Sequence, residues 1–190
     1  ILAESAAVYK NSAGVSTLGL KSYLQKECSK YNLTKIDIID PSGNSVIDST
    51  SYLQDSTYKQ VQNGKAFLSD PIIINDEVFF DYACPYDNSV VMIRFPYSIL
   101  GEIIDDVKIG ETGSTYILNK DGAKVAHSDF SLVQKQQNNL EDVKTDSKTY
   151  GEVAALETAM TKGETGFGFY TWKGDRKFGA YTPIENTNGW

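Results

Sequence analysis

Hydrophobic and polar positions follow two different periods along the chain. In residues 1–31, Leu20, Tyr23, Leu24 and Tyr31 recur at intervals of three, four and seven, and no proline interrupts the segment. This spacing places them on one face of an α-helix. The remaining chain alternates apolar and polar residues in short runs separated by Gly, Asn, Asp and Pro, which is typical of strands joined by tight turns. The pattern therefore predicts a long N-terminal helix followed by sheet.

The later elements can be placed approximately. Strands or hairpins are expected over residues 36–47, 66–74, 78–85, 89–95, 115–128 and 167–182, and helices over 58–63, 96–107 and 151–162. The Gln/Asn/Lys-rich segment 129–150 is expected to be a loop or a short helix. Sequential hairpins form antiparallel sheets, and helices then cover them. The predicted fold class is α+β.

The chain contains an internal repeat. Residues 36–49 and 115–128 align without a gap, and their turn glycines, Gly43 and Gly122, coincide. The match resumes further on, where Gly64 corresponds to Gly163. The second copy carries additional residues between its two halves. Two related modules in series are therefore expected.

Composition excludes several classes of protein. The 190 residues carry a net charge of −7 without a long basic cluster, which argues against nucleic acid as a partner. No metal-ligand spacing accompanies the single His127, and no catalytic motif accompanies the Ser, Asp and His residues, so no metal, cofactor or enzymatic activity is expected. Cys28 and Cys84 could form a disulfide or remain two buried thiols. Both ends of the chain suggest a piece of a longer protein.

Three stretches carry a resemblance to a known family. Residues 39–46 are similar to a "D-x-x-G-x-V" hairpin, and residues 55–71 to a segment ending in "S-D-P". Residues 110–128 resemble the most specific of the three signatures, "G-x-T-G" followed by "D-x-x-G" and "H-P". All three belong to the double Cache (dCache) family of bacterial extracytoplasmic sensor domains.

The resemblance implies an architecture and a location. It implies two tandem PAS-like (Cache) modules after the long N-terminal helix: residues 1–33 for the helix, 34–107 for a membrane-distal module and 108–190 for a membrane-proximal module. Such domains are anchored in the bacterial cell membrane, on its extracytoplasmic side, by segments that would lie outside this chain. They bind a small molecule in the distal module and signal to a chemoreceptor (a methyl-accepting chemotaxis protein) or a sensor histidine kinase.

The resemblance also implies a partner for the N-terminal helix. Members of the family often dimerise through the first helix. Ile1, Val8 and Val15 lie seven residues apart and could form such a seam, although the same residues could belong to an ordinary core helix. A homodimer is therefore one of two interpretations of this pattern.

The ligand segment departs from the amino-acid-binding subfamily. That subfamily has Arg and Trp where this chain has Asp55 and Thr57, and Asp on the last strand where this chain has Arg94. Only Tyr58 is kept. The chain is therefore not assigned as a standard amino-acid sensor, and its ligand is expected among amino acids, amines and organic acids.

The exchanged charges allow three interpretations. A zwitterion could be held with reversed polarity, its anion on Arg94 and its cation on Asp55. A carboxylate could instead bind Arg94 alone. If residues 87 and 88 form the turn, Asp81 faces Arg94 across the hairpin, and the two would make an ordinary cross-strand ion pair.

Three tyrosines complete the candidate site. Tyr52, Tyr58 and Tyr82 are expected to form aromatic walls of a ligand pocket, or else to be ordinary core aromatics. The function predicted is that of an extracellular ligand-binding sensor domain of a transmembrane signalling receptor. The alternative is a structural or adhesive extracellular module without a small-molecule ligand.

Overall fold

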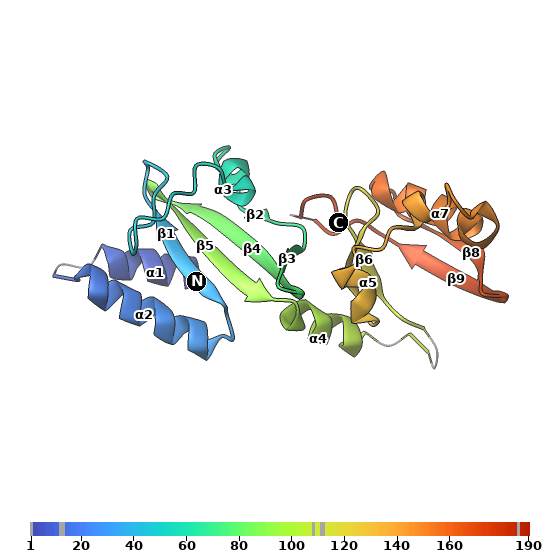
Figure 1. Ribbon diagram of the computed structural model, residues 1–190, viewed down its shortest axis with the longest axis horizontal. Coiled ribbons are helices and arrows are strands. Elements are labelled where there is room, and N and C mark those ends of the chain that lie inside the picture. Colours follow the sequence, from blue (N-terminus) through green and yellow to red (C-terminus); the bar gives the residue numbers. More distant parts are fainter. Residues whose placement is uncertain (1, 12–13, 108, 111–112, 186) are drawn as a thin grey trace. The chain divides into compact units, whose positions relative to one another are not determined.

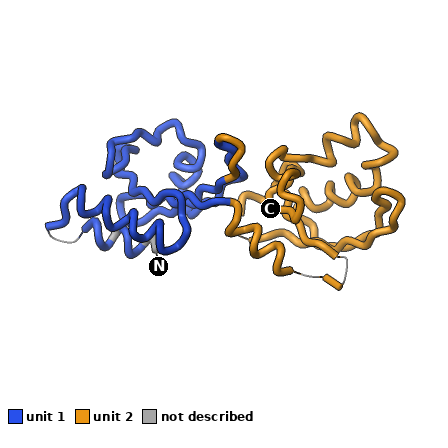
Figure 2. Tube along the Cα trace, turned by 60° about the horizontal axis from the view of Figure 1, so that its bottom comes forward, with its two compact units in different colours: residues 1–74, 79–96 blue, residues 75–78, 97–190 orange. Residues whose placement is uncertain are grey.

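A computed structural model describes residues 2–11, 14–107, 109–110, 113–185 and 187–190. The chain forms two compact units. The first contains residues 1–74 and 79–96, and the second contains residues 75–78 and 97–190 (Figure 2). The segment after residue 96 thus groups with the second unit.

The predicted single N-terminal helix is wrong, because the segment forms two helices. Helix α1 spans Leu2–Lys10 and α2 spans Thr17–Lys30. Gly14 lies between them with φ +84°, a conformation that favours glycine. Ser16 then caps α2, since its side chain accepts a hydrogen bond from the Gly19 N–H at 3.1 Å. The helical character of the segment is confirmed, whereas the break between the two helices differs from the prediction.

The two helices alter the proposed dimer seam. Val8 on α1 is exposed, whereas Val15 lies beyond the end of α1 and packs against the core. Ile1 lies outside the described residues. Val8 and Val15 therefore do not share one continuous helix.

The first unit is built on a five-stranded sheet. Its strands follow the order β1-β5-β4-β2, and β3 pairs with β4. The strand bounds are β1 Lys35–Ile39, β2 Phe67–Leu68, β3 Ile72–Ile74, β4 Glu77–Tyr86 and β5 Ser89–Pro96. The strand expected over residues 66–74 is interrupted before Pro71, which cannot donate a ladder hydrogen bond. The long hairpin of β4 and β5 agrees with the sequence prediction.

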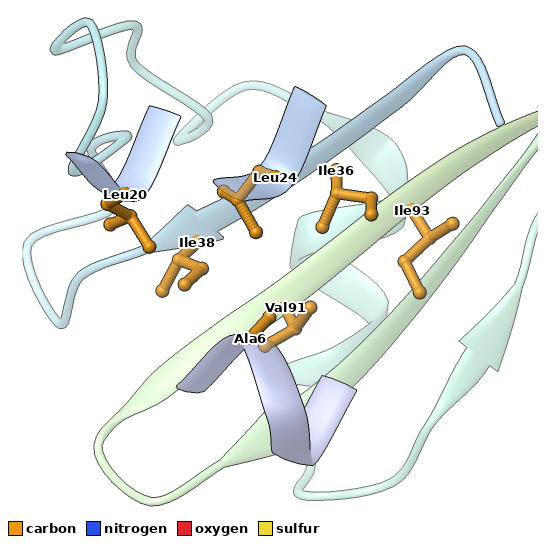
Figure 3. Close-up of a cluster of buried hydrophobic side chains, with 7 residues drawn as sticks. All are labelled: Ala6, Leu20, Leu24, Ile36, Ile38, Val91 and Ile93. Atoms are coloured by element: carbon orange, nitrogen blue, oxygen red, sulfur yellow. The ribbon is translucent and has the colours of Figure 1, made fainter. Parts of the chain in front are cut away.

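Helices cover both faces of this sheet (Figure 1). On one face, α1 and α2 pack on strands β1 and β5, and Figure 3 shows the buried side chains between them: Ala6, Leu20, Leu24, Ile36, Ile38, Val91 and Ile93. On the other face, helix α3 (Ser56–Val61) places Tyr58 and Val61 against Ala83 and Met92. Side chains alternate between the two faces along each strand, so neighbouring residues pack into the hydrophobic clusters on opposite faces of the sheet.

The second unit contains two hairpins and four helices in its described part. Helix α4 spans Ser98–Asp106, α5 Phe130–Gln134, α6 Asn139–Asp142 and α7 Ser147–Thr161. Strands β6 (Tyr116–Leu118) and β7 (Lys124–His127) form one hairpin, and β8 (Gly166–Trp172) and β9 (Asp175–Tyr181) form the other. The segment expected to be a loop or a short helix, 129–150, thus contains α5, α6 and the start of α7.

Candidate functional site

A row of polar side chains crosses three strands on the α3 face of the first unit. The antiparallel register places Arg94 of β5 opposite Lys35 of β1 and opposite Asp81 of β4. Residues that face each other across strands point to the same side of a sheet. The predicted pairing of Asp81 with Arg94 is confirmed. It follows from the turn at residues 87 and 88, which leaves Tyr86 opposite Ser89.

Asp81 and Arg94 form a bidentate ion pair. Arg94 Nε donates to Asp81 Oδ1 and Nη2 donates to Oδ2, both at 2.7 Å. Asp81 is buried, and its backbone N–H donates to Ser69 Oγ at 2.9 Å. The two parallel hydrogen bonds fix the plane of the guanidinium.

Arg94 keeps unused binding capacity. Its pKa is raised, first by the hydrogen bonds to Asp81; burial opposes this, while the charge of Asp81 and then that of Asp55 add to it. The side chain remains 29% exposed, and Nη1 makes no hydrogen bond within the described residues. The guanidinium on the α3 face is therefore charged and partly exposed, and one of its nitrogens has no hydrogen-bond partner within the described residues.

Asp55 combines a structural contact with a free oxygen. It is the N-cap of α3, and its Oδ1 accepts a hydrogen bond from the Tyr58 N–H at 2.8 Å. The other oxygen, Oδ2, accepts no hydrogen bond in the described part of the chain. Asp55 is half-buried, and its charge acts on Arg94. The two residues whose charges are exchanged relative to the family motif therefore influence each other.

Tyr52 lies in a buried network that the sequence reasoning missed. Its hydroxyl donates to Asp37 Oδ2 and accepts from Lys35 Nζ, both at 2.7 Å, and Lys35 Nζ lies 3.0 Å from the same Asp37 oxygen. Burial raises the pKa of Tyr52 to about 12; the Lys35 hydrogen bond opposes this and Asp37 adds to it. Lys35 and Asp37 alternate with isoleucines in β1, and this alternation could have indicated that the two polar side chains share one face of the sheet.

Asp37 is saturated and therefore structural. Besides Tyr52 and Lys35, it accepts hydrogen bonds from the Ile38 N–H at 2.8 Å and from Ser45 Oγ at 2.7 Å. Its side chain is fully buried. A buried carboxylate with this many donors holds its neighbours in place rather than binding an external group.

The structure brings together five of the six predicted residues. Tyr52, Asp55, Tyr58, Asp81 and Arg94 lie on the α3 face, and we call them the α3-face cluster. Tyr58 is buried, with its ring packed in the core under α3. Tyr82 does not join them, because it follows Asp81 in β4 and packs on the α1–α2 face.

The remaining candidate residues do not belong to the α3-face cluster. His127 Nδ1 accepts a hydrogen bond from the Asp129 N–H at 2.8 Å. Cys28 and Cys84 are free, half-buried thiols. No group of three or more His, Cys, Asp or Glu residues suited to a metal occurs in the part of the chain that the structure describes.

The first unit is an α+β domain in which helices cover both faces of an antiparallel sheet. A family model for the Cache domain matches residues 9–190, so the chain belongs to the Cache family. A comparison with curated proteins gives no significant match. Within the described residues, no helix is long and apolar enough to cross a membrane.

Solved structures share the fold. The ligand-binding domain of the Pseudomonas aeruginosa PAO1 amino acid chemoreceptor PctC, in complex with GABA, is similar with a TM-score of 0.68 and 13% identity, covering 99% of this chain and 84% of that chain. The extracellular domain of mmHK1S-Z3, a predicted histidine kinase, has a TM-score of 0.70 at 12% identity, covering 99% and 82%. The Campylobacter jejuni chemoreceptor Tlp3 sensory domain has a TM-score of 0.61 at 12% identity, covering 92% and 76%.

Proposed function

We propose that this chain is the extracellular sensor domain of a transmembrane signalling receptor, a chemoreceptor or a histidine kinase, and that it binds a small metabolite at the α3-face cluster. The observation that carries the proposal is the unused pair of opposite charges, Arg94 Nη1 and Asp55 Oδ2, on one face of the first unit. The family supports it, as does the likeness to receptor domains with bound amino acids, such as PctB with L-Arg and PctC with GABA.

The two charges favour a ligand with both an ammonium and a carboxylate. The carboxylate would bind Arg94 Nη1, while Nε and Nη2 stay with Asp81. The ammonium would bind Asp55 Oδ2, while Oδ1 keeps capping α3. Because each partner uses a free atom, binding leaves both structural contacts intact. The polarity is the reverse of the amino-acid motif, which agrees with the exchanged residue types.

The proposal extends to the rest of the receptor. Residues 34–107 would be the membrane-distal sensing module and 108–190 the module that transmits the signal. Segments outside this chain would anchor it in the bacterial cell membrane, and its N-terminal helices would contribute to a homodimer. The α3-face cluster lies in the first unit, which supports the assignment of sensing to the first module.

A thermal-shift screen with amino acids, amines and organic acids tests the sensor function. A ligand that binds only the folded state raises the melting temperature with concentration. No rise with any of these classes would contradict the proposal and favour a structural or adhesive module.

The site itself is tested with Arg94→Lys and Arg176→Lys. Arg94→Lys keeps a positive charge beside Asp81 but removes the planar fork, whereas Arg176 is exposed on β9 and distant in sequence from the cluster. Loss of one charged hydrogen bond corresponds to a roughly 10-fold to 100-fold weaker Kd. We expect this loss, measured by calorimetry, for Arg94→Lys only. Equal affinities of the two variants for the ligand would exclude the α3-face cluster as the binding site.

A further inference from the structure

A separate pocket opens at the edge of the first unit's sheet. Its volume is about 620 Å³, and it lies between α2 and the outer strand β1, next to the segment that follows the first turn. Residues that contribute to its wall include Lys21, Gln25, Cys28, Asn32, Lys35 and Asp48. We call it the β1-edge pocket. The volume is within the range of about 300–1,000 Å³ typical of small-molecule sites.

The pocket is not suited to an added peptide strand. The outward carbonyl of Ile38 already accepts a hydrogen bond from the Val46 N–H at 2.9 Å, and the Ile38 N–H donates to Asp37 at 2.8 Å. The backbone of Ile36 contacts the Cys28 thiol. Pairing with a further strand needs a run of free backbone groups along the edge. Since these groups of β1 are engaged, a small molecule is the better occupant.

The wall offers charges of both signs. Lys21 is exposed and makes no ion pair within the described residues. Asp48 is exposed as well, and its Oδ1 accepts a hydrogen bond from the Thr50 N–H at 3.0 Å. Hydrogen bonds from the side chain and backbone of Thr50 lower the pKa of Asp48 to about 2, so it is ionised at neutral pH. Leu24, Ile36 and Ile47 provide an apolar surface between the polar groups.

Lys35 is a residue that lies next to both sites. It contributes to the wall of the β1-edge pocket, and its ammonium bonds Tyr52 and Asp37 beside the α3-face cluster. Burial opposes the charge of Lys35, but the hydrogen bonds to Tyr52 and Asp37 outweigh it and raise the pKa of Lys35. Its charge is thus already compensated by Asp37, which leaves Lys21 and Asp48 as the groups available to a ligand.

We propose that the β1-edge pocket is a second binding site, distinct from the α3-face cluster, and that it takes a small zwitterion. Lys21 binds the anionic group, Asp48 binds the cationic group, and Leu24, Ile36 and Ile47 contact the chain between them. The balance of signs disfavours a simple anion or cation, because one charged wall residue would then be left facing a like charge. This site does not require that the α3-face cluster binds anything.

Alkylation of Cys28 gives a direct test on the intact chain. The Cys28 thiol lines the pocket, whereas Cys84 lies on β4 outside it and serves as an internal reference. The probes are GABA, glycine betaine, L-glutamine and L-arginine, each titrated during reaction with iodoacetamide, with both cysteines followed by peptide mass spectrometry. We expect at least one probe to slow Cys28 alkylation with a saturable concentration dependence and to leave Cys84 unchanged. Absence of protection by all four probes would overturn the proposal.

Matched variants assign the protection to the pocket. Gln25 and Lys26 are adjacent exposed residues of α2, and only Gln25 lines the pocket. Gln25→Trp fills the space and should abolish protection, whereas Lys26→Trp should retain it. Lys21→Gln and Asp48→Asn should each raise the half-protecting concentration roughly 10-fold or more, the value of one charged hydrogen bond.

The variant Arg94→Lys separates this site from the α3-face cluster. Cys28 protection that persists in Arg94→Lys supports an independent second site, even if the first site proves not to bind. Protection that disappears in Arg94→Lys but survives in Gln25→Trp would place the probe at the α3-face cluster and overturn the proposal. Circular dichroism of each variant checks that it is folded.

Discussion

Asp40 and Asn119 make the same turn 79 residues apart in the sequence. The Oδ1 of Asp40 accepts hydrogen bonds from the N–H groups of Ser42 and Asn44 at 2.9 and 3.0 Å. The Oδ1 of Asn119 accepts from Asp121 and Ala123 at 3.0 and 2.9 Å. The glycine in each turn has positive φ, +80° for Gly43 and +87° for Gly122. The aligned repeat in the sequence is therefore also a repeat of hydrogen bonding.

This equivalence predicts the effect of exchanging the two residues. Asn119→Ala removes both hydrogen bonds and should lower the free energy of unfolding by about 1–3 kcal/mol. Asn119→Asp keeps the accepting oxygen, as Asp40 does in the first turn, and should cost much less. Urea unfolding of the two variants measures the difference. Equal losses would show that the side-chain oxygen does not hold the turn.

Lys124 and Glu157 form a buried ion pair whose removal should be strongly context-dependent. Lys124 Nζ and Glu157 Oε1 lie 2.7 Å apart, and the two side chains are 4% and 1% exposed. The other carboxylate oxygen, Glu157 Oε2, has no hydrogen-bond partner within the described residues. Burial lowers the pKa of Lys124, against the opposing effect of Glu157. Glu157→Leu leaves the lysine buried without its partner and should destabilise the fold by about 3–5 kcal/mol.

The double variant Lys124→Met with Glu157→Leu is the informative control. It removes both charges, so it should recover most of the stability that Glu157→Leu loses. The remaining loss is that of the buried Asn139 amide, which donates to Glu157 Oε1 at 2.9 Å and has no acceptor in either variant. A double-mutant cycle by chemical unfolding gives the coupling energy. Additive losses would contradict the interpretation that most of the single-variant cost comes from an unpaired buried charge.

His127 should make the fold sensitive to mild acid. Burial, followed by the charge of Lys124, lowers the pKa of His127, while Asp129 opposes the shift. Its Nδ1 accepts the Asp129 N–H and the ring lies beside Tyr116, so the neutral form fits the site. Because the unfolded chain binds the proton more readily, the stabilisation present above about pH 6.5 is lost as the pH falls through the folded-state pKa.

The pH dependence can be isolated by substitution. The melting temperature of the unmodified chain should fall faster between pH 7 and 5 than that of His127→Gln. Parallel curves for the two proteins would refute a contribution from this histidine. The carboxylates titrate in both proteins and cancel in the comparison.

Two substitutions of Asp55 distinguish its role as the N-cap of α3 from its proposed role in ligand binding. Asp55→Asn retains an oxygen that can cap the helix, so stability should change by less than about 1 kcal/mol. The negative charge is lost, and the affinity for a zwitterionic ligand of the α3-face cluster should fall roughly 10-fold or more. Asp55→Ala should lose both the helix cap and the affinity for the ligand. Calorimetric titration together with thermal unfolding distinguishes these effects, and unchanged binding by Asp55→Asn would remove Asp55 from the site.

Local signals were sufficient for most elements of the sheet and helices. The alternation of residues and the turn at 87 and 88 determined the register of β4 with β5, and therefore the opposition of Asp81 and Arg94. The apolar face over residues 96–107 predicted α4, and the glycines of the repeat predicted the first turn of each copy. These features depend on neighbours in sequence, which is why the pattern alone could specify them.

Three features depended on contacts between distant segments. The interruption between α1 and α2 lets both helices pack on one sheet face, and helical periodicity continued across it. Tyr82 was grouped with Arg94 on residue type, although the pleat directs it to the opposite core. Lys35 and Asp37 were missed because their partner Tyr52 lies beyond a turn, and only folding brings the three together.

The sequence by itself determined the α+β class, the turn that recurs in residues 36–49 and 115–128, and the positions of the charged residues Asp55 and Arg94, because period, turn residues and charge are local properties. The tertiary structure decided which of those charges are already used. Arg94 keeps one nitrogen and Asp55 one oxygen without a hydrogen bond within the described residues. Asp37 is saturated by its neighbours, and both oxygens of the buried Asp81 accept hydrogen bonds from Arg94. That distinction rests on burial and on hydrogen bonds between strands, and it exists only once the strands are side by side.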